Sequence, residues 1–300
     1  MPELVNLGSF CIDYVYAVPA IVRAGETLLG AAPVRHPGGK GLNQSLAAAR
    51  AGARVAHIGC VGADGVWLKD LLATAGVNVD GVRVCQSNPT GHAIIQVGPH
   101  GENAIVIVGG ANRTIQPSDV QRAIARAGDR GWLLLQNEIN DVDVVLGEAA
   151  RAGVRIAFNV APVDGRESAY ALDDVELLLL NEIEAAALAR EGDPSHALER
   201  LTRERPTQHV VITLGARGVL YGRGSERIQL PAFEVAAVDE TGAGDAFIGH
   251  LLAAWFDETL SVTERLRRAC AAGALAVCSP GAADAIPDAA AVQRFLAQCR

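Results

Sequence analysis

The sequence lacks the features that mark membrane proteins and nucleic-acid-binding proteins. No apolar run in its 300 residues approaches the 18 residues needed for a membrane-spanning helix. No basic run stands out and the formal net charge is −8, so we expect neither a nucleic-acid surface nor a membrane surface as partner. An anionic ligand would have to be bound locally, by helix ends, single basic side chains or a metal ion.

The cysteines lack any zinc or redox pattern. No two of them form a C-x-x-C pair, and no group of cysteine and histidine has the spacing of a zinc site. The chain also shows no signal peptide at its start. We therefore expect a cytoplasmic protein with six reduced cysteines that mostly pack in its interior: Cys11, Cys60, Cys85, Cys270, Cys278 and Cys299.

Strands and helices are expected to alternate along most of the chain. Half of the residues are hydrophobic, which is enough for one large domain, or for one large domain with a small attachment. The alternation predicts a mostly parallel sheet with helices on both faces. Strands are predicted at 3–10, 53–62, 132–136, 154–159, 177–180 and 209–214. Helices are predicted at 42–51, 66–76, 117–127, 141–152, 182–190, 194–203, 244–256, 261–277 and 288–298.

Three segments depart from this alternation. Residues 91–112 hold two apolar runs around the sequence GPHG, which is the pattern of a β-hairpin. A second hairpin fits residues 218–230. Residues 13–36 are half polar and contain two prolines and two glycines, so we predict an irregular segment there.

The segment DETGAGDAF, residues 239–247, places an aspartate behind three small residues at the start of a predicted helix. Gly242 and Gly244 let the backbone approach a ligand closely, and Ala243 adds little bulk. Backbone N–H groups at a helix start favour a phosphate, and Asp245 could accept a proton from an attacking hydroxyl. A tight turn with a capping aspartate explains the local pattern as well.

Three further segments combine residues that are typical of turns with polar side chains. PGGKGLNQ, starting at residue 37, is not a Walker loop, but it offers N–H groups, Lys40 and Asn43 before a helix. In LLLLNEIE, Asn181 and Glu184 follow a buried strand and suit Mg²⁺ held through water, or simply cap a helix. VVITLGARGVLY, starting at residue 210, suits either a simple turn or a loop around an adenine and its ribose.

The order and spacing of these segments resemble the ribokinase-like sugar kinases, the PfkB family. The segments are GGKGLNQ near residue 40, TGHAIIQV and GENAIVIVGGAN near 100, LLNEIEAAAL near 180, ITLGARGV near 213 and DETGAGDAF near 240. The resemblance covers essentially the whole chain. Its most specific motif, DTxGAGD, reads D-E-T-G-A-G-D here, with Glu240 as a variant.

The resemblance implies a ribokinase-like three-layer αβα sandwich with a small β lid. Residues 1–12, 37–90 and 111–300 would form the core that binds nucleotide and substrate. Residues 13–36 and 91–110 would form the lid over the substrate, which in this family often also carries the dimer contact. We therefore expect a homodimer joined through the lid.

The resemblance also implies ATP-dependent phosphorylation of a sugar hydroxyl, with the primary hydroxyl of a pentose such as D-ribose as the first expectation. Asp245 would be the general base, and Gly242, Ala243 and Gly244 would form the anion hole. The residues implied to bind the sugar are Cys11, Asp13, Gly38, Gly39, Lys40, Asn43, Glu138 and Asp245.

The nucleotide and the cations have implied binding residues as well. Those for ATP are Asn181, Glu184, Thr213, Leu214, Gly215, Ala216, Arg217, Gly218, Gly244 and Cys270, with Glu184 reaching Mg²⁺ through water. A potassium ion would be held, largely by backbone carbonyls, by Asp239, Thr241, Ala276, Ser279, Gly281 and Ala285.

Three positions depart from the family pattern and leave the acceptor open. Cys11 replaces an asparagine, and a thiol is a poor substitute for an amide that bonds a hydroxyl. Ala285 replaces a serine near the cation, and Cys270 replaces a polar residue near the nucleotide. A nucleoside, a ketohexose such as fructose or a deoxyribose are alternative acceptors. A catalytically inactive ligand-binding relative is a further alternative, whereas a nicotinamide-binding protein is disfavoured because no G-x-G-x-x-G follows the first strand.

Overall fold

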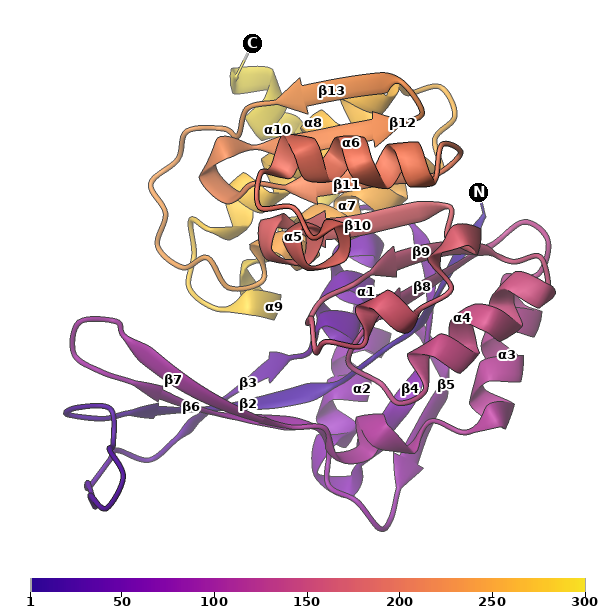
Figure 1. Cartoon of the computed structure of the whole chain (residues 1–300). Coiled ribbons are helices and arrows are strands. Elements are labelled where there is room, and N and C mark those ends of the chain that lie inside the picture. The colour runs from indigo at the N-terminus through magenta and orange to yellow at the C-terminus, as the bar shows by residue number, and fades with distance from the viewer. Residues whose placement is uncertain (1, 300) are drawn as a thin grey trace.

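The computed structural model describes residues 2–299 and contains a large and a small β-sheet (Figure 1). The large sheet has nine strands in the order β13-β12-β11-β10-β9-β8-β1-β4-β5. Its strands are β1 (Glu3–Leu7), β4 (Arg54–Gly62), β5 (Asn78–Cys85), β8 (Trp132–Gln136), β9 (Arg155–Asn159), β10 (Leu177–Asn181), β11 (His209–Thr213), β12 (Val219–Arg223) and β13 (Glu226–Leu230). All neighbours pair in parallel except β11 with β12 and β12 with β13.

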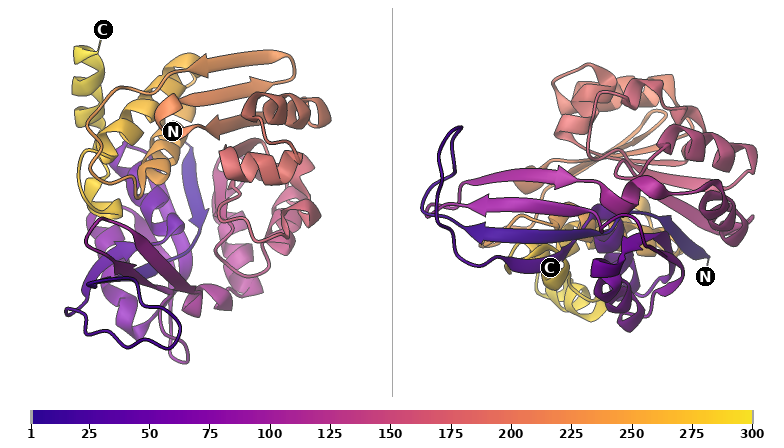
Figure 2. Two further views of the ribbon diagram at one scale, coloured as in Figure 1. Left: turned by 60° about the vertical axis from the view of Figure 1, so that its left-hand side comes forward. Right: turned by 90° about the horizontal axis from the view of Figure 1, so that it is seen from below.

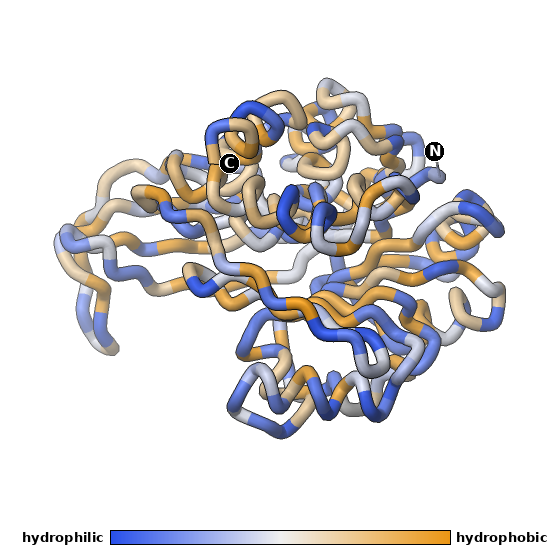
Figure 3. The backbone as a smooth tube through the Cα atoms, turned by 90° about the horizontal axis from the view of Figure 1, so that it is seen from above, coloured by the Kyte–Doolittle hydropathy of each residue, from blue (hydrophilic) through white to orange (hydrophobic). Residues whose placement is uncertain are grey.

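Helices cover both faces of the large sheet, so the chain forms a three-layer αβα sandwich. On one face lie α3 (Pro117–Ala127), α4 (Val142–Arg151), α5 (Glu182–Ala189) and α6 (Pro194–Glu204). On the other lie α1 (Lys40–Arg50), α2 (Val66–Thr74), α7 (Ala243–Trp255) and α8 (Val262–Ala276), and two further helices, α9 (Ala282–Ala285) and α10 (Ala289–Gln298), follow in the chain. In Figure 3 hydrophobic stretches run along the strands, and hydrophilic residues gather in outer helices and turns.

The central strands of the large sheet are covered by helices on both faces, so their side chains are apolar on both faces. In β8, Leu133 and Leu135 pack against α3 and α4, whereas Trp132 and Leu134 pack against the helices of the opposite face. A strand of this kind reads as a continuous hydrophobic run, and this is why it was predictable from sequence. The predicted strands at 132–136, 154–159, 177–180 and 209–214 are all confirmed within one residue at either end.

The order of strands reverses at β1, which lies between β8 and β4. In open parallel sheets ligands bind beyond the carboxyl ends of the strands, at such a reversal. Polar residues gather at these ends here: Gln136 ends β8, Asn159 ends β9, Asn181 ends β10 and Thr213 ends β11. The topology therefore places the candidate site at this edge of the large sheet.

The small sheet projects from one side of the large domain (Figures 1 and 2). Its order is β3-β2-β6-β7, built from β2 (Cys11–Ala17), β3 (Val34–Gly38), β6 (His92–Val97) and β7 (Asn103–Val108). The predicted hairpin at 91–112 is confirmed as β6 and β7, and that at 218–230 as β12 and β13.

Some sequence predictions were wrong. Residues 13–36 are not irregular throughout, because their ends belong to β2 and β3. These strands are half exposed, so they lack the apolar run of a buried strand and read as polar. The first strand ends at Leu7 rather than at residue 10, and the edge strand β5 was not predicted. Among residues 2–299, no helix is long and apolar enough to span a membrane.

Candidate active site

Asp245 lies in the first turn of α7, but it does not cap that helix. Gly242, in a left-handed conformation with φ of 77°, precedes the helix and makes no side-chain cap. The buried Asp245 carboxylate instead accepts hydrogen bonds from two amides of α1: Asn43 Nδ2 at 3.0 Å to Oδ2, and Gln44 Nε2 at 2.8 Å to Oδ1. Capping therefore does not explain this aspartate, and its side chain belongs to a tertiary site.

Helices α1 and α7 can meet in this way because small residues separate their backbones. A β-carbon added at Gly249, one turn after Asp245, would lie 2.3 Å from the β-carbon of Ala47. Ala47 lies one turn after Asn43 on the same helix. Glycine at position 249 is therefore required for the close approach that joins Asp245 to its amide partners.

A cavity of about 250 Å³ lies in front of Asp245, at the carboxyl edge of the large sheet. It brings together residues from α1, α5, α7 and the ends of β9, β10 and β11. Twelve of its lining residues belong to the predicted motifs: Lys40, Leu179, Leu180, Asn181, Glu184, Val211, Thr213, Glu240, Gly242, Gly244, Asp245 and Phe247. Sequence reasoning missed Asn159 in this lining, although its place at the end of a predicted strand could have indicated it.

Lys40 brings a positive charge among the carboxylates of this cavity. Burial lowers the pKa of Lys40, but the charges of Asp245, Glu138 and Glu184 more than offset burial and hold the pKa above its ordinary value. Lys40 therefore stays charged at neutral pH. A cation fixed beside the cavity can attract a phosphate group.

Glu138 lies behind Lys40 and is tied to the start of α1. Its Oε2 accepts hydrogen bonds from the backbone N–H of Lys40 at 2.9 Å and from the Ser9 hydroxyl. Burial raises the pKa of Glu138, partly opposed by the charge of Lys40. Ser9 also accepts from the Gly41 N–H at 3.1 Å, so it joins Glu138 to the glycine turn; no motif indicated Ser9 in the sequence.

Asn181 and Glu184 form a reciprocal capping box at the start of α5. Asn181 Oδ1 accepts from the Glu184 N–H at 2.9 Å, and Glu184 Oε2 accepts from the Asn181 N–H at 2.7 Å. The capping alternative for this pair is thus confirmed. Both residues nevertheless line the cavity, and burial raises the pKa of Glu184.

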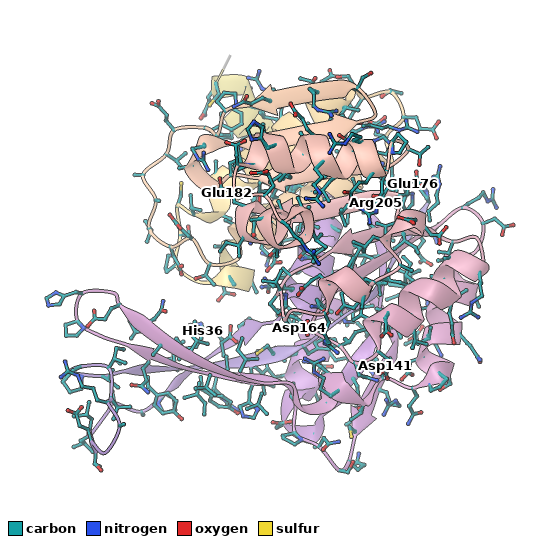
Figure 4. All side chains as sticks on the ribbon, viewed as in Figure 1. His36, Asp141, Asp164, Glu176, Glu182 and Arg205 are labelled. Atoms are coloured by element: carbon teal, nitrogen blue, oxygen red, sulfur yellow. The ribbon has the colours of Figure 1, made fainter. Side chains whose placement is uncertain are left out.

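The predicted sugar-binding residues outside this cavity gather where the small sheet joins α1. Cys11 pairs with Gly38 across β2 and β3, and a β-carbon at Gly38 would lie 2.2 Å from the Asp13 carboxylate. Burial, followed by the charge of Asp13, raises the pKa of the Cys11 thiol, so it stays protonated. His36, paired with Asp13, lies on the small sheet (Figure 4).

Gly39, with φ of 94°, turns the chain from β3 into α1. A β-carbon there would lie 2.9 Å from the Cys11 nitrogen, so the turn packs directly on β2. The turn thus connects the Cys11 and Asp13 group to Lys40 and Asn43. The predicted sugar-binding residues therefore adjoin the cavity without lining it, apart from Lys40 and Asp245.

The predicted nucleotide loop contributes Thr213 to the cavity, and its other residues lie outside the lining. Residues Gly215–Arg217 form one 3₁₀ turn, and Arg217 pairs with Glu182. Glu182, labelled in Figure 4, lies at the start of α5. Gly218 has a structural reason to be glycine, because a β-carbon would lie 2.0 Å from the Leu230 carbonyl oxygen. The other residues of this loop are Leu214 and Ala216.

Cys270 does not line the cavity and packs in the apolar core. It lies in α8 with 9% of its surface exposed. Burial raises its pKa to about 12, so the thiol is neutral. The structure thus gives Cys270 a packing role.

The predicted potassium-binding residues lie in the loop before α7 and in the segment from the end of α8 to the end of α9, and these two segments contact each other. Asp239 accepts from the Thr241 N–H at 2.9 Å and from the Gly281 N–H at 2.8 Å. A β-carbon at Gly242 would lie 2.9 Å from Ala282, so the two segments touch at the residue that precedes α7. Within the part of the chain that the structure describes, no cluster of histidine, cysteine and acidic residues could hold a metal. Ala276, Gly281 and Ala285 carry no side-chain oxygen, so these three residues could bind a cation only through their backbone carbonyls.

Comparisons with known proteins agree with this fold and site. Residues 1–289 match the sequence profile described as pfkB family carbohydrate kinase. The ribokinase of Haemophilus influenzae is 35% identical over 301 residues, covering 98% of both chains. The deoxyribokinase of Salmonella typhi is 27% identical, again over 98% of both. The structure of Arabidopsis thaliana ribokinase complexed with ribose and ATP has a TM-score of 0.86 at 29% identity, covering 98% of both chains.

The fold and the cavity, taken with these matches, define an ATP-dependent carbohydrate kinase. The chain belongs to the pfkB family of carbohydrate kinases.

Proposed function

We propose that the protein transfers the γ-phosphoryl group of ATP to the primary hydroxyl of a pentose, with D-ribose as the first candidate. One observation carries the proposal. The Asp245 carboxylate is buried at the helix start, is not used for capping, and is held by two amides beside a cavity that also holds Lys40. A carboxylate placed in this way suits the removal of a proton from an attacking hydroxyl.

In the proposed mechanism, Asp245 accepts the proton of the sugar hydroxyl while its oxygen attacks the γ-phosphorus. The backbone N–H groups of Gly242, Ala243 and Gly244 stabilise the charge on the transferred phosphoryl oxygens. Lys40 supplies a fixed positive charge on the same group. Asp245 then holds the proton while the sugar phosphate and ADP leave.

The cations have residues that fit them. Asn181 and Glu184 line the cavity and would hold Mg²⁺ through water, because an amide and a carboxylate offer the oxygen ligands it prefers. Asp239, Thr241, Ala276, Ser279, Gly281 and Ala285 would hold K⁺ beside the anion hole. Mg²⁺ would neutralise charge on the nucleotide phosphates, and K⁺ would add positive charge near the N–H groups.

D-Ribose is preferred as the acceptor because the chain is 35% identical to the ribokinase and only 27% identical to the deoxyribokinase. Asp13 and Glu138 would bind sugar hydroxyls, together with the N–H groups of Gly38 and Gly39. Cys11 favours the deoxyribose alternative, since a thiol replaces an amide at a position that faces the sugar. Nucleoside and fructose-type acceptors and a ligand-binding relative without activity are the remaining alternatives.

The test is ADP release with MgATP and potassium across a panel of pentoses, deoxyribose, ketohexoses and nucleosides. Asp245→Asn should lower kcat about 10²–10⁴-fold, whereas Asp129→Asn, at an exposed turn, should not. Turnover with D-ribose that depends on Asp245 supports the proposal, and turnover with another acceptor alone replaces ribose. An Asp245→Asn variant as active as the parent would refute the proposed base.

We also propose that the small sheet both covers the sugar as a lid and forms a homodimer contact, because both of its faces carry apolar side chains. Asp13, Ala93 and Ile107 are paired across β2, β6 and β7 and share one face, which is the sugar face. Ile94, Val106 and Val108 lie on the other face and are 40%, 61% and 40% exposed. A lid over a sugar needs one apolar face, so we assign the second face to a homodimer contact.

A further inference from the structure

A row of buried amide side chains extends from Asp245 through the large sheet. Gln44 Nε2 donates to Asp245 Oδ1 and to Asn159 Oδ1 at 2.9 Å. Gln136 Nε2 donates to Gln44 Oε1 at 2.8 Å and to Asn6 Oδ1 at 3.2 Å. Each of these four amides is at most 5% exposed. Of these residues only Gln44 contacts Asp245, so the others can act on Asp245 only through it.

Backbone carbonyls fix the amide orientation at both ends of this row. Asn6 Nδ2 donates to the Gly41 carbonyl at 2.8 Å, and Asn159 Nδ2 donates to the Leu179 carbonyl at 3.2 Å. A carbonyl can only accept, so each of these amides must turn its nitrogen toward the backbone. Their oxygens are therefore fixed as acceptors that face Gln136 and Gln44.

Between these fixed ends, Gln44 has a single orientation that satisfies its neighbours. Its oxygen accepts from Gln136, and its nitrogen donates to Asp245 and Asn159. The flipped orientation would set its oxygen against the Asp245 carboxylate and the Asn159 oxygen, and its nitrogen against that of Gln136. Buried groups left unpaired in this way cost about 1–3 kcal/mol each.

Gln136 is the member of the row that donates to the Gln44 oxygen and so supports this orientation from the other side. Its nitrogen donates in both directions, whereas its oxygen is buried without a hydrogen-bond partner among the described residues. It ends the otherwise apolar strand β8, where leucine would bury no unpaired oxygen. The position therefore contributes two donors, and these donors act on Asn6 and Gln44.

We propose that Gln136 is a positioning residue for phosphoryl transfer, acting through Gln44 to keep an amide N–H on Oδ1 of Asp245. With Asn43 on Oδ2, the carboxylate is then held by one donor on each oxygen and keeps its plane fixed relative to the cavity. Gln136 does not line the cavity. The inference rests on the proposed role of Asp245 as the base.

The test replaces Gln136 with methionine, which keeps the size of the side chain and removes both donors. Gln136→Met should lower kcat at least 10-fold, while the KM values for ATP and sugar stay within about twofold. Leu135→Met, at the neighbouring buried position of the same strand, is the matched control and should leave kcat unchanged. An unchanged kcat in Gln136→Met would overturn the inference.

A double-mutant cycle separates positioning from general damage to the fold. If Gln136 acts through Gln44, then adding Gln136→Met to Gln44→Leu should lower kcat no further. If Gln136→Met lowers kcat by the same factor with and without Gln44, its effect does not depend on Gln44, and the inference is overturned. An Asp245→Asn enzyme with the kcat of the parent would instead refute Asp245 as the base. Failure of the Gln136 inference can therefore be distinguished from failure of the proposed function.

A second variant covers the case in which Gln136→Met does not fold. Gln136→Glu keeps the shape of the side chain, and its carboxyl can donate one hydrogen bond when protonated and none when ionised. Relative to the parent enzyme, its kcat should therefore fall as pH rises through the titration of the new group. A constant ratio of the two kcat values across pH would contradict the proposed donor role.

Discussion

Asn181 and Glu184 hydrogen-bond to each other in both directions, and both also line the cavity. The pair therefore has a structural role and a proposed cation-binding role, which a single substitution can separate. Glutamine at position 184 can still accept the N–H of Asn181, because capping boxes use either residue. Only the negative charge is lost.

For Glu184→Gln we therefore expect an unfolding midpoint close to that of the parent protein and a clear rise in the Mg²⁺ concentration needed for half-maximal activity. Thermal unfolding and a magnesium titration of ADP release measure the two effects. Glu264→Gln, in the exposed capping box of α8 with Ser261, is the matched control. A normal magnesium requirement in Glu184→Gln would exclude Glu184 from cation binding.

A substitution at Gly244 tests the proposed anion hole, because a β-carbon there meets no atom within 4 Å. Gly244→Ala should thus leave the fold intact, and it removes a glycine from a helix, which favours stability by up to about 1 kcal/mol. The added methyl group would enter the space proposed for the phosphoryl oxygens, so we expect kcat/KM for ATP to fall at least 10-fold. Denaturant unfolding and steady-state kinetics give the two readouts. Kinetics like the parent's would mean that phosphate does not lie against Gly244.

From the burial of His57 we expect the folded protein to lose stability as the pH falls. His57 is fully buried, and burial lowers its pKa to about 4 from the ordinary value of 6.5. Between these values the unfolded chain binds a proton that the folded chain does not, so stability is lost as pH falls from about 6.5 to about 4. The loss from this residue is at most about 3 kcal/mol.

Urea unfolding across this pH range should show the loss, and His57→Gln should reduce its slope. Burial also lowers the pKa of His209 to about 4, so the slope should shrink rather than vanish in the single variant. His100→Gln, at an exposed turn, is the control and should keep the full slope. A slope in His57→Gln equal to the parent's would contradict the prediction.

Val106 and Ile107 are neighbours on β7 that point to opposite faces of the lid. Val106→Asp should break the proposed dimer with little change in sugar KM at assay concentrations. Ile107→Asp should keep the dimer and raise the sugar KM. Analytical ultracentrifugation measures the oligomeric state and steady-state kinetics measure the sugar KM. Together they show which face of the small sheet forms the dimer contact. Two dimeric variants, or a monomeric parent protein, would refute a dimer contact on the Val106 face.

The large sheet was predictable because its signals are local. Strands such as β8 are short apolar runs, and the helices between them carry caps and glycine stops that depend on nearby residues. β2 and β3 were missed because polar residues interrupt their apolar runs. β6 and β7, the other two strands of the small sheet, carry the two apolar runs of the predicted hairpin and were found, although β7 is mostly exposed.

The site was predictable as a set of motifs but not as a set of contacts. Asp245 and Asn43 were expected near one another from the family resemblance, whereas Gln44, Gln136 and Asn6 carried no signal of their own. The hydrogen bonds of Asn43 and Gln44 to Asp245 exist because α1 and α7 meet at Ala47 and Gly249, which lie about 200 residues apart, whereas Gln136 and Asn6 reach α1 from β8 and β1. No local pattern encodes such an approach.

The distance between these two helices along the chain has a consequence for biosynthesis. The amides on α1 leave the ribosome early, and the carboxylate on α7 follows 202 residues after Asn43. Until α7 is made, Ala47 on α1 lacks the close contact with Gly249. A chain that ends before Asp245 would therefore hold the amides of Asn43 and Gln44 without the carboxylate that we propose as proton acceptor.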